Sequence, residues 1–229
     1  MSDLLFFHSI KTMSLAIFDL DNTLISDDSD HLWGEFLVEQ NLVDAANYAE
    51  ANTQFYNDYC RGQLDIKQYL KFALSFLAEH PLEQLYQWRE QFVEEKIRPL
   101  VLPAAQKLIK QHQDKGDTLI VITATNQFVT EPIVALFNIP NMLATEPEIN
   151  HNRYTGGYVG EPCYQHGKVT RLNRWLQKNN QTLDDSLFYS DSHNDIPLLN
   201  KVTWPTAVDP DDTLRQYALD KKWPIISLR

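Results

Sequence analysis

The stretch AIFDLDNTLISDDSD, residues 16–30, places five aspartates within twelve positions: Asp19, Asp21, Asp27, Asp28 and Asp30. Carboxylates this close repel one another unless some are protonated, solvated or bound to a cation. The apolar run at residues 15–20 is short and ends among acid and amide side chains, which predicts a buried strand. Ligand sites form at the carboxyl ends of parallel strands, so the acids indicate a site where this strand ends.

Composition limits the possible partners. The chain has 229 residues, 43% of them hydrophobic and 22% charged, which fits one large globular domain or a domain with an insertion. A net charge of −11, with no run of Lys or Arg, argues against binding to nucleic acid or to an anionic membrane surface. No apolar segment reaches the roughly 18 residues that a membrane-spanning helix needs.

The cysteines and the first residues of the chain bear on location. Cys60 and Cys163 are far apart and have no metal-site spacing, which predicts a cytoplasmic protein in a reducing compartment. The first residues lack the basic region and cleavage site of a secretory signal. Met13 stands just ahead of the first strand, so we interpret residues 1–12 as an extension or the product of an alternative start.

Strand-like and helix-like segments alternate along the chain. After the first strand, residues 26–97 carry only helical spacing of apolar side chains, with breaks at Gly62 and Pro81. This pattern predicts an α/β fold in which a parallel sheet has helices on both faces and an all-helical block is inserted after the first strand. The later segments are predicted strands at 118–123, 142–145, 186–190 and 204–208, helices at 104–115, 128–137 and 169–178, and a hairpin or flap at 149–160.

Polar residues recur where these segments end or begin. Thr123 ends the second strand, and Lys168 opens the helix that follows the flap. Asp191 and Asp195 follow the fourth strand. Because the carboxyl ends of parallel strands meet at one edge of a sheet, we expect acid, hydroxyl and ammonium groups to gather there.

This set resembles the haloacid dehalogenase superfamily, in particular its phosphoserine-phosphatase-like branch, whose members carry a helical cap. The family's first motif, DxDx[TV], stands at residues 19–23 as DLDNT, and its acidic fourth motif stands at residues 190–195 as SDSHND. Thr123 and Lys168 stand for the second and third motifs. The resemblance implies a Rossmann-like catalytic core, and the domains it implies are a core of residues 1–25 and 98–229 and a cap of residues 26–97.

The resemblance also implies a reaction. It makes Asp19 the nucleophile that forms an aspartyl-phosphate, and Asp21 the general acid that later activates water. The implied cofactor is Mg²⁺, a hard cation suited to oxygen ligands. Its implied ligands are Asp19, the main-chain carbonyl of Asp21, Asp191 and the phosphate.

The remaining motif residues would bind the phosphoryl group or support the nucleophile. By the resemblance, the hydroxyl of Thr123 and the N–H of Ala124 hold phosphoryl oxygens, and Asn194 contacts the phosphate. Lys168 neutralises developing charge and orients the nucleophile, and Asp195 positions Lys168. We interpret one aromatic stripe of the insertion as packing residues, namely Trp33, Phe36, Phe76, Trp88 and Phe92.

The resemblance weakens at the substrate. Phosphoserine phosphatases carry a Glu after the first motif that meets the substrate's amine, and Asp28 stands at that place. They also carry a cap arginine, eleven residues after a glycine, that pairs with the substrate's carboxylate; counting from Gly62 gives Ala73. A buried carboxylate without a partner is unfavourable. The predicted substrate is therefore a small phosphate ester with an amine and no carboxylate, such as histidinol phosphate.

Other functions stay open beside a phosphatase for such an ester. One is phosphoserine phosphatase proper, and another is a phosphomutase or phosphotransferase in which a second hydroxyl replaces water. A non-enzymatic phospho-aspartate signalling domain is disfavoured, because such domains are about half this length, lack a cap and have no place for Asp21. The sequence indicates neither the oligomeric state nor a role for His193.

Overall fold

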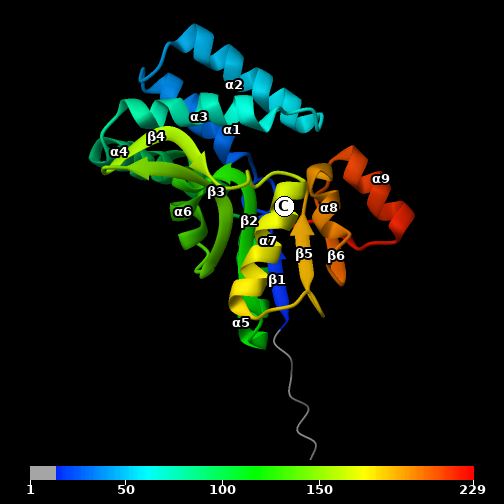
Figure 1. The fold of residues 1–229 in the computed structure, drawn as a ribbon. Coiled ribbons are helices and arrows are strands. Elements are labelled where there is room, and N and C mark those ends of the chain that lie inside the picture. Colours follow the sequence, from blue (N-terminus) through cyan, green and yellow to red (C-terminus); the bar gives the residue numbers. More distant parts are fainter. Residues whose placement is uncertain (1–13) are drawn as a thin grey trace, which may run out of the picture.

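The computed structural model describes residues 14–229, and within them a seven-stranded sheet forms the centre of the molecule (Figure 1). The extension that we expected at residues 1–12 lies outside the described residues. The strand order is β4-β3-β2-β1-β5-β6-β7, with every neighbouring pair parallel except β3 and β4. The strands are β1 (Leu15–Phe18), β2 (Thr118–Asn126), β3 (Asn141–Asn150), β4 (Arg153–Val159), β5 (Leu187–Ser190), β6 (Trp204–Val208) and β7 (Ile225–Ile226).

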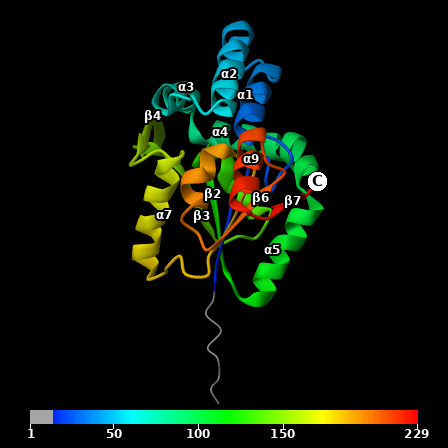
Figure 2. The same cartoon turned by 90° about the vertical axis from the view of Figure 1, so that its right-hand side faces the viewer.

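Helices cover both faces of this sheet and one of its edges. Figure 2 shows α5 on one side of the sheet and α7 on the other. In Figure 1, α1 to α4 lie above the edge toward which the arrow of β5 points. The helices are α1 (Ser29–Glu39), α2 (Ala45–Cys60), α3 (Ile66–Glu79), α4 (Leu82–Phe92), α5 (Pro103–Lys115), α6 (Gln127–Ala135), α7 (His166–Asn179), α8 (Ile196–Leu199) and α9 (Asp212–Lys221). None of the helices in the described part of the chain is long and apolar enough to cross a membrane.

The buried strands divide their side chains between two hydrophobic clusters. In β1, Ala16 and Phe18 belong to one cluster, and Leu15 and Ile17 belong to the other. This alternation is what a strand buried on both faces produces, because successive side chains point to opposite faces. The first cluster includes residues of α5 and α6, and the second includes residues of α7, α8 and α9. The central strands are thus fixed from both sides, and so is the edge at which they end.

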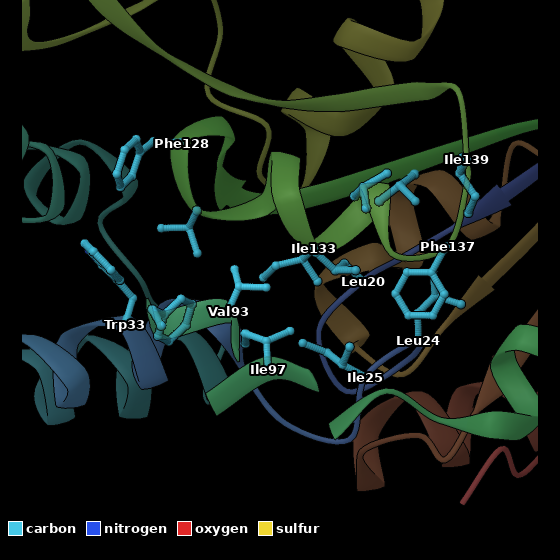
Figure 3. Close-up of a cluster of buried hydrophobic side chains, with 14 of the residues drawn as sticks. Leu20, Leu24, Ile25, Trp33, Val93, Ile97, Phe128, Ile133, Phe137 and Ile139 are labelled. Atoms are coloured by element: carbon cyan, nitrogen blue, oxygen red, sulfur yellow. The ribbon is translucent and has the colours of Figure 1, made fainter. Parts of the chain in front are cut away.

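The helical insertion shares the first cluster with the core. Trp33 of α1 packs edge-to-face on Phe92 of α4 and on Phe128 of α6, with ring centroids 5.2 and 5.7 Å apart. Figure 3 shows this cluster running from Trp33 past Val93 to Ile25, beside the loop after β1. The five aromatic side chains that the sequence predicts to be packing residues lie in or against this cluster: Trp33, Phe36, Phe76, Trp88 and Phe92.

The flap is a β-hairpin, as predicted. Its two-residue turn, His151 and Asn152, has positive φ at both positions, which suits the twist of a hairpin. Gly156 of β4, with φ +81°, lies against Ala78 of α3, so the hairpin packs on the insertion. The predicted core strands are all present. β3 continues to Asn150, because its second half pairs with β4 instead of ending at the sheet edge.

Candidate active site

The carboxyl ends of β1, β2 and β5 bring the predicted site residues together. Asp19 directly follows β1, and its main-chain N–H donates to the carbonyl of Tyr189 in β5, with 2.9 Å between nitrogen and oxygen. Thr123 lies in β2, and Asp191 directly follows β5. The parallel register of these strands places all of them at the edge below the helical insertion.

Asp19 is part of a buried charge network. The ammonium of Lys168 donates to Asp19 Oδ1 at 3.1 Å and to Asp195 at 2.8 Å, and all three side chains are nearly inaccessible to solvent. Burial raises the pKa of Asp19 well above its usual value, and the charge of Lys168 opposes this rise. Burial would lower the pKa of Lys168, but the carboxylates of Asp19 and Asp195 raise it, so the ammonium stays protonated.

The local chain conformation sets the position of Lys168. It is the third residue of α7, and the helix begins after Gln165, which has a positive φ of 46°. At Gly167, a Cβ atom would overlap with the carbonyl of Pro162, so only glycine allows this close approach. The turn delivers Lys168 to the sheet edge from the face that α7 covers.

Asp21 is held by three donors. Its Oδ1 accepts from the main-chain N–H of Ser29 at 2.8 Å, and its Oδ2 accepts from the hydroxyls of Thr125 at 2.8 Å and Thr123 at 3.3 Å. The sequence analysis did not single out Thr125. A signal for it existed, since Thr123 and Thr125 are two positions apart on one strand and therefore share a face.

Thr123 and Ala124 both line the cavity above Asp19, together with Thr125. The hydroxyl oxygen of Thr123 accepts from the N–H of Thr125 at 3.2 Å. The position of Thr123 and Ala124 at the cavity wall is compatible with the predicted role in holding phosphoryl oxygens, which stays a prediction.

The acids of this edge fit a hard cation. Asp191 accepts from the hydroxyl of Thr23 at 2.9 Å, and burial raises its pKa to about 7. Lys168 lies between Asp19 and Asp195, so Asp191 adds a carboxylate that this ammonium does not contact. Within residues 14–229 no three Asp, Glu, His or Cys side chains gather as a complete metal site. One or two carboxylates completed by carbonyl, water and phosphate oxygens is a common arrangement for Mg²⁺.

Asn194 is hydrogen-bonded to the insertion and to the loop before Lys168. Its amide donates to the carbonyl of Tyr59 at the end of α2 at 3.0 Å and accepts from Tyr164 and Gln165 at 3.0 and 2.9 Å. It does not line the cavity. In this arrangement, Asn194 joins the insertion to the loop before Lys168. A phosphate contact for Asn194 stays a prediction.

His193 and Asp195 have distinct partners in the fourth motif. His193 pairs with Asp211 at the start of α9, at 2.8 Å from Nδ1 to Oδ2. The carboxylate of Asp195 accepts from the hydroxyl of Ser190 at 2.7 Å as well as from Lys168, and makes no cap for α8. The place of Asp195 is compatible with the predicted support of Lys168, which stays a prediction.

The cavity over Asp19 extends into the helical insertion. Its empty volume is about 520 Å³, part of which is open to solvent. The core contributes Asp19, Asp21 and residues 123–125 to its wall. The insertion contributes acids, an amide and mostly aromatic or aliphatic side chains: Asp28, Asp30, His31, Asn52, Phe55, Tyr56, Tyr59, Leu64, Ile66 and Tyr69.

The position chosen from the sequence as the carboxylate reader is not in this wall. Ala73 is buried in α3 and does not line the cavity, and the same holds for Phe76, whose ring packs on Trp33 and Trp88. Ile66 and Tyr69, one to two turns earlier on α3, line the cavity instead. The count of eleven residues from Gly62 led to the correct helix, α3, but to a turn that does not line the cavity. The absence of a cationic partner nevertheless holds, because no Lys or Arg is among the lining residues, which all lie within the described part of the chain.

Comparison with known proteins agrees with this site. The chain matches the haloacid dehalogenase-like hydrolase family over residues 16–200. A histidinol-phosphatase of Neisseria meningitidis serogroup C (strain 8013) is 45% identical over 220 residues, which cover 94% of this chain and 99% of that protein. The phosphoserine phosphatase SerB1 of Mycobacterium tuberculosis (strain ATCC 25618 / H37Rv) is 27% identical over 96% of this chain and 72% of its own length.

Solved structures extend the comparison. A protein of unknown function from Bordetella pertussis Tohama I is 40% identical, with a TM-score of 0.90 over 95% of this chain and all of its own. A substrate-bound phosphoserine phosphatase is similar in fold, with a TM-score of 0.69 and 18% identity over 95% of this chain and 93% of its own. The chain belongs to the haloacid dehalogenase-like hydrolase family. Within that family it is a phosphatase, as the relatives that span nearly its whole length indicate.

Proposed function

We propose that this phosphatase is a Mg²⁺-dependent histidinol-phosphatase that works through an aspartyl-phosphate on Asp19. The observation that carries the substrate is the leaving-group end of the cavity, where Asp28 and Asp30 lie among aromatic side chains and no Lys or Arg of residues 14–229 belongs to the wall. The histidinol-phosphatase of Neisseria meningitidis, at 45% identity, supports the same choice.

The two candidate substrates differ in one group. Phosphoserine and histidinol phosphate share a primary phosphate ester and a neighbouring ammonium, but phosphoserine carries a carboxylate where histidinol phosphate carries an imidazolylmethyl group. A carboxylate in this cavity would face Asp28 and Asp30 without a cationic partner, which is unfavourable for like charges in a partly desolvated site. An imidazole ring would instead meet aromatic faces and carboxylate acceptors.

In the first half-reaction, a carboxylate oxygen of Asp19 attacks phosphorus while the bond from phosphorus to the ester oxygen breaks. Lys168 holds that carboxylate, which keeps one oxygen turned toward the cavity. Asp21, protonated at this stage, gives its proton to the leaving alkoxide, and histidinol departs as the alcohol. The donors on both oxygens of Asp21 fix its carboxyl group during the transfer.

In the second half-reaction, Asp21 accepts a proton from water, and the water oxygen attacks the phosphorus of the aspartyl-phosphate. The bond between phosphorus and the Asp19 oxygen breaks, which restores the carboxylate and releases inorganic phosphate. Thr123 and Ala124 line the cavity where they can donate to phosphoryl oxygens. Asp19 and Asp191 would hold Mg²⁺, which when bound supplies positive charge to the phosphoryl oxygens.

The same proposal divides the chain. Residues 98–229, together with those up to residue 25, form the catalytic core, and residues 26–97 form a cap that supplies the leaving-group end of the cavity. The placement of α1 to α4 over the sheet edge supports this division. The free Cys60 and Cys163 support a cytoplasmic location.

The test is a comparison of kcat/KM for histidinol phosphate and phosphoserine at fixed pH and Mg²⁺ concentration. We expect a preference of tenfold or more for histidinol phosphate, because a charged group without a partner typically costs about 1.5–3 kcal/mol. Phosphate release with no added acceptor distinguishes hydrolysis from transfer to a second hydroxyl. A tenfold preference for phosphoserine would show that the proposed substrate is wrong. This result would not bear on the roles proposed for the catalytic residues.

A further inference from the structure

The cavity carries two carboxylates that the reaction at Asp19 does not use. Asp28 precedes α1 as its N-cap and Asp30 lies in its first turn, and both line the cavity wall. Burial raises the pKa of Asp28 well above its usual value and that of Asp30 to about 7. No Lys or Arg from residues 14–229 shares this wall. Neither acid therefore has a positively charged side chain beside it in this wall, and a ligand can supply a positive charge or a further N–H group.

The two acids differ in what holds them. Oδ1 of Asp28 accepts from the main-chain N–H groups of Asp30 and His31, at 3.0 and 2.8 Å, which is the capping arrangement of a helix start. Asp30 instead lies beside Tyr69 of α3, whose hydroxyl favours the ionised form of this acid and lowers its pKa. Asp28 is therefore fixed by its own loop, and Asp30 by a side chain from another helix of the insertion.

The neighbours of the two acids differ, although the charge of Asp21, the proposed general acid, raises the pKa of both. Asp28 also raises the pKa of Tyr59, on which the proposed nucleophile acts as well. Asp30 acts more strongly than Asp28 on Tyr69 of α3. Asp28 thus lies toward the reacting end of the cavity, and Asp30 toward α3.

Aromatic rings line the cavity beside both acids. Phe55 meets Tyr69 edge to face, with ring centroids 5.4 Å apart. His31 stacks on Tyr56, with centroids 4.6 Å apart and planes 23° from parallel. All four side chains line the cavity. Ring faces and edges of this kind favour a flat ligand group, and a carboxylate beside them favours one that bears an N–H.

We infer that Asp30, held by Tyr69, accepts a hydrogen bond from the imidazole ring of the leaving group, while Asp28 pairs with its ammonium. The inference rests on the proposed function and assigns one carboxylate to each nitrogen-bearing group of histidinol. It makes Asp30 the specificity-determining residue for the ring and Tyr69 the positioning residue for Asp30.

The experiment uses three esters and the Mg²⁺-loaded full-length enzyme. Histidinol phosphate carries both amine and ring, aminopropyl phosphate keeps the amine without the ring, and imidazolylpropyl phosphate keeps the ring without the amine. kcat/KM is measured for each ester with the unmodified enzyme and with Asp28→Asn, Asp30→Asn and Tyr69→Phe. Asn is as good an N-cap as Asp, so Asp28→Asn keeps the start of α1. Asp27→Asn is the matched control, since Asp27 lies on the same loop outside the cavity wall.

We expect Asp30→Asn to lower kcat/KM for the two ring-bearing esters by at least tenfold more than for aminopropyl phosphate. Asp28→Asn should show the opposite pattern and act on the two amine-bearing esters. Tyr69→Phe should repeat the pattern of Asp30→Asn with a smaller loss, and it tests the inference should Asp30→Asn fold poorly. Asp27→Asn should change all three values equally or not at all.

Equal losses on all three esters with Asp30→Asn and with Tyr69→Phe would overturn the inference, and so would no loss on any. If the unmodified enzyme prefers histidinol phosphate while both variants treat ring and no-ring esters alike, the inference fails and the proposed function stands. If the unmodified enzyme prefers phosphoserine and rejects the ring-bearing esters, the proposed function fails, and the inference fails with it.

Discussion

The two ends of the cavity handle charge in opposite ways. At the phosphoryl end, Asp19 and Asp195 are joined by a buried Lys168, whose ammonium contacts both carboxylates. At the leaving-group end, the partners of Asp28 and Asp30 among residues 14–229 are main-chain N–H groups for Asp28 and the neighbouring hydroxyl of Tyr69 for Asp30. The first end is built before any ligand arrives. The second is left incomplete, and we interpret this as the part that selects the substrate.

Loss of the nucleophile at the phosphoryl end should have the largest effect on activity. Asp19→Asn leaves an amide beside Lys168, which keeps a hydrogen-bond partner for the ammonium but removes the attacking carboxylate. We expect kcat to fall by about three decades or more for every ester, with the fold retained by circular dichroism. The matched control, Asp27→Asn, should stay close to the unmodified enzyme. A loss below tenfold for Asp19→Asn would contradict the assignment of the nucleophile.

Removal of the metal should lower activity about as much as loss of the nucleophile, and the loss should not depend on the leaving group of the ester. Chelation with EDTA should abolish hydrolysis of histidinol phosphate and of an aryl phosphate alike, and added Mg²⁺ should restore both. Ca²⁺ should not substitute, because it adopts a looser geometry with more ligands. Full activity of the metal-free enzyme would contradict the proposal that Asp19 and Asp191 hold Mg²⁺.

Replacement of Lys168 tests whether the phosphoryl end is a closed network. Lys168→Met leaves Asp19 and Asp195 buried without their cation, which typically costs about 3–5 kcal/mol in the free energy of unfolding. We expect kcat to fall about a hundredfold or more and the melting temperature to fall further at pH 8 than at pH 5. The pH difference arises because burial already raises the pKa of Asp19, and protonation relieves the unpaired charge. An equal loss of melting temperature at both pH values would show that the lysine acts through packing alone.

The phosphoryl end was also the part that the sequence predicted best. Its residues follow strand ends or open a helix, and the parallel sheet fixes where such positions meet. The geometry thus brings Asp19, Lys168 and Asp195 together from positions up to 176 residues apart. The α/β fold, the helical insertion and the hairpin follow from the same periodic patterns. The two-residue β7 was not predicted, because so short a run gives no periodic signal.

For the leaving-group end, the sequence predicted which types of residue are present but not which position of α3 lines the cavity. The sequence indicated acids and no carboxylate-binding arginine, yet the residue counted for that role, Ala73, lies away from the cavity. Packing between helices decides which turn of α3 meets the cavity, and a residue count along one helix does not contain that information. Thr125 was missed for a related reason. A threonine in a strand is ordinary, and only the fold shows that its hydroxyl meets Asp21.

Replacement of Thr125 should have an effect of intermediate size, and it tests whether the Thr125 hydroxyl positions Asp21. Its hydroxyl can donate to Asp21 when that carboxylate is ionised and rotate when it is protonated, so it holds the group in both half-reactions. Thr125→Val should lower kcat about tenfold for histidinol phosphate and less for an aryl phosphate, whose leaving group needs little protonation. Thr125→Ser keeps the hydroxyl and should restore most of the activity. Equal losses for both esters would indicate that Thr125 shapes the cavity and does not position the acid.

The smallest expected effect concerns stability at the leaving-group end. Burial raises the pKa of Asp30 to about 7, while an aspartate in an unfolded chain titrates near about 4. Between these pH values the folded protein keeps a proton that the unfolded chain has lost, so the free energy of unfolding falls as pH rises through this window. The groups facing Asp30 do not reverse this sign, because Asp21 and Asp28 are acids, and Tyr69 and Tyr48 are not cationic.

Asp30→Asn removes the titration and keeps the shape of the side chain. We therefore expect the variant, without substrate, to melt at a higher temperature than the unmodified protein at pH 8 and at the same temperature near pH 4. The gain should be on the order of 1 kcal/mol, because the side chain is half-buried and water screens part of the effect. Thermal melts at both pH values, with Asp27→Asn as control, provide the measurement. A variant that melts lower at pH 8 would mean that Asp30 already stabilises the fold through Tyr69, and that this end of the cavity is complete without a substrate.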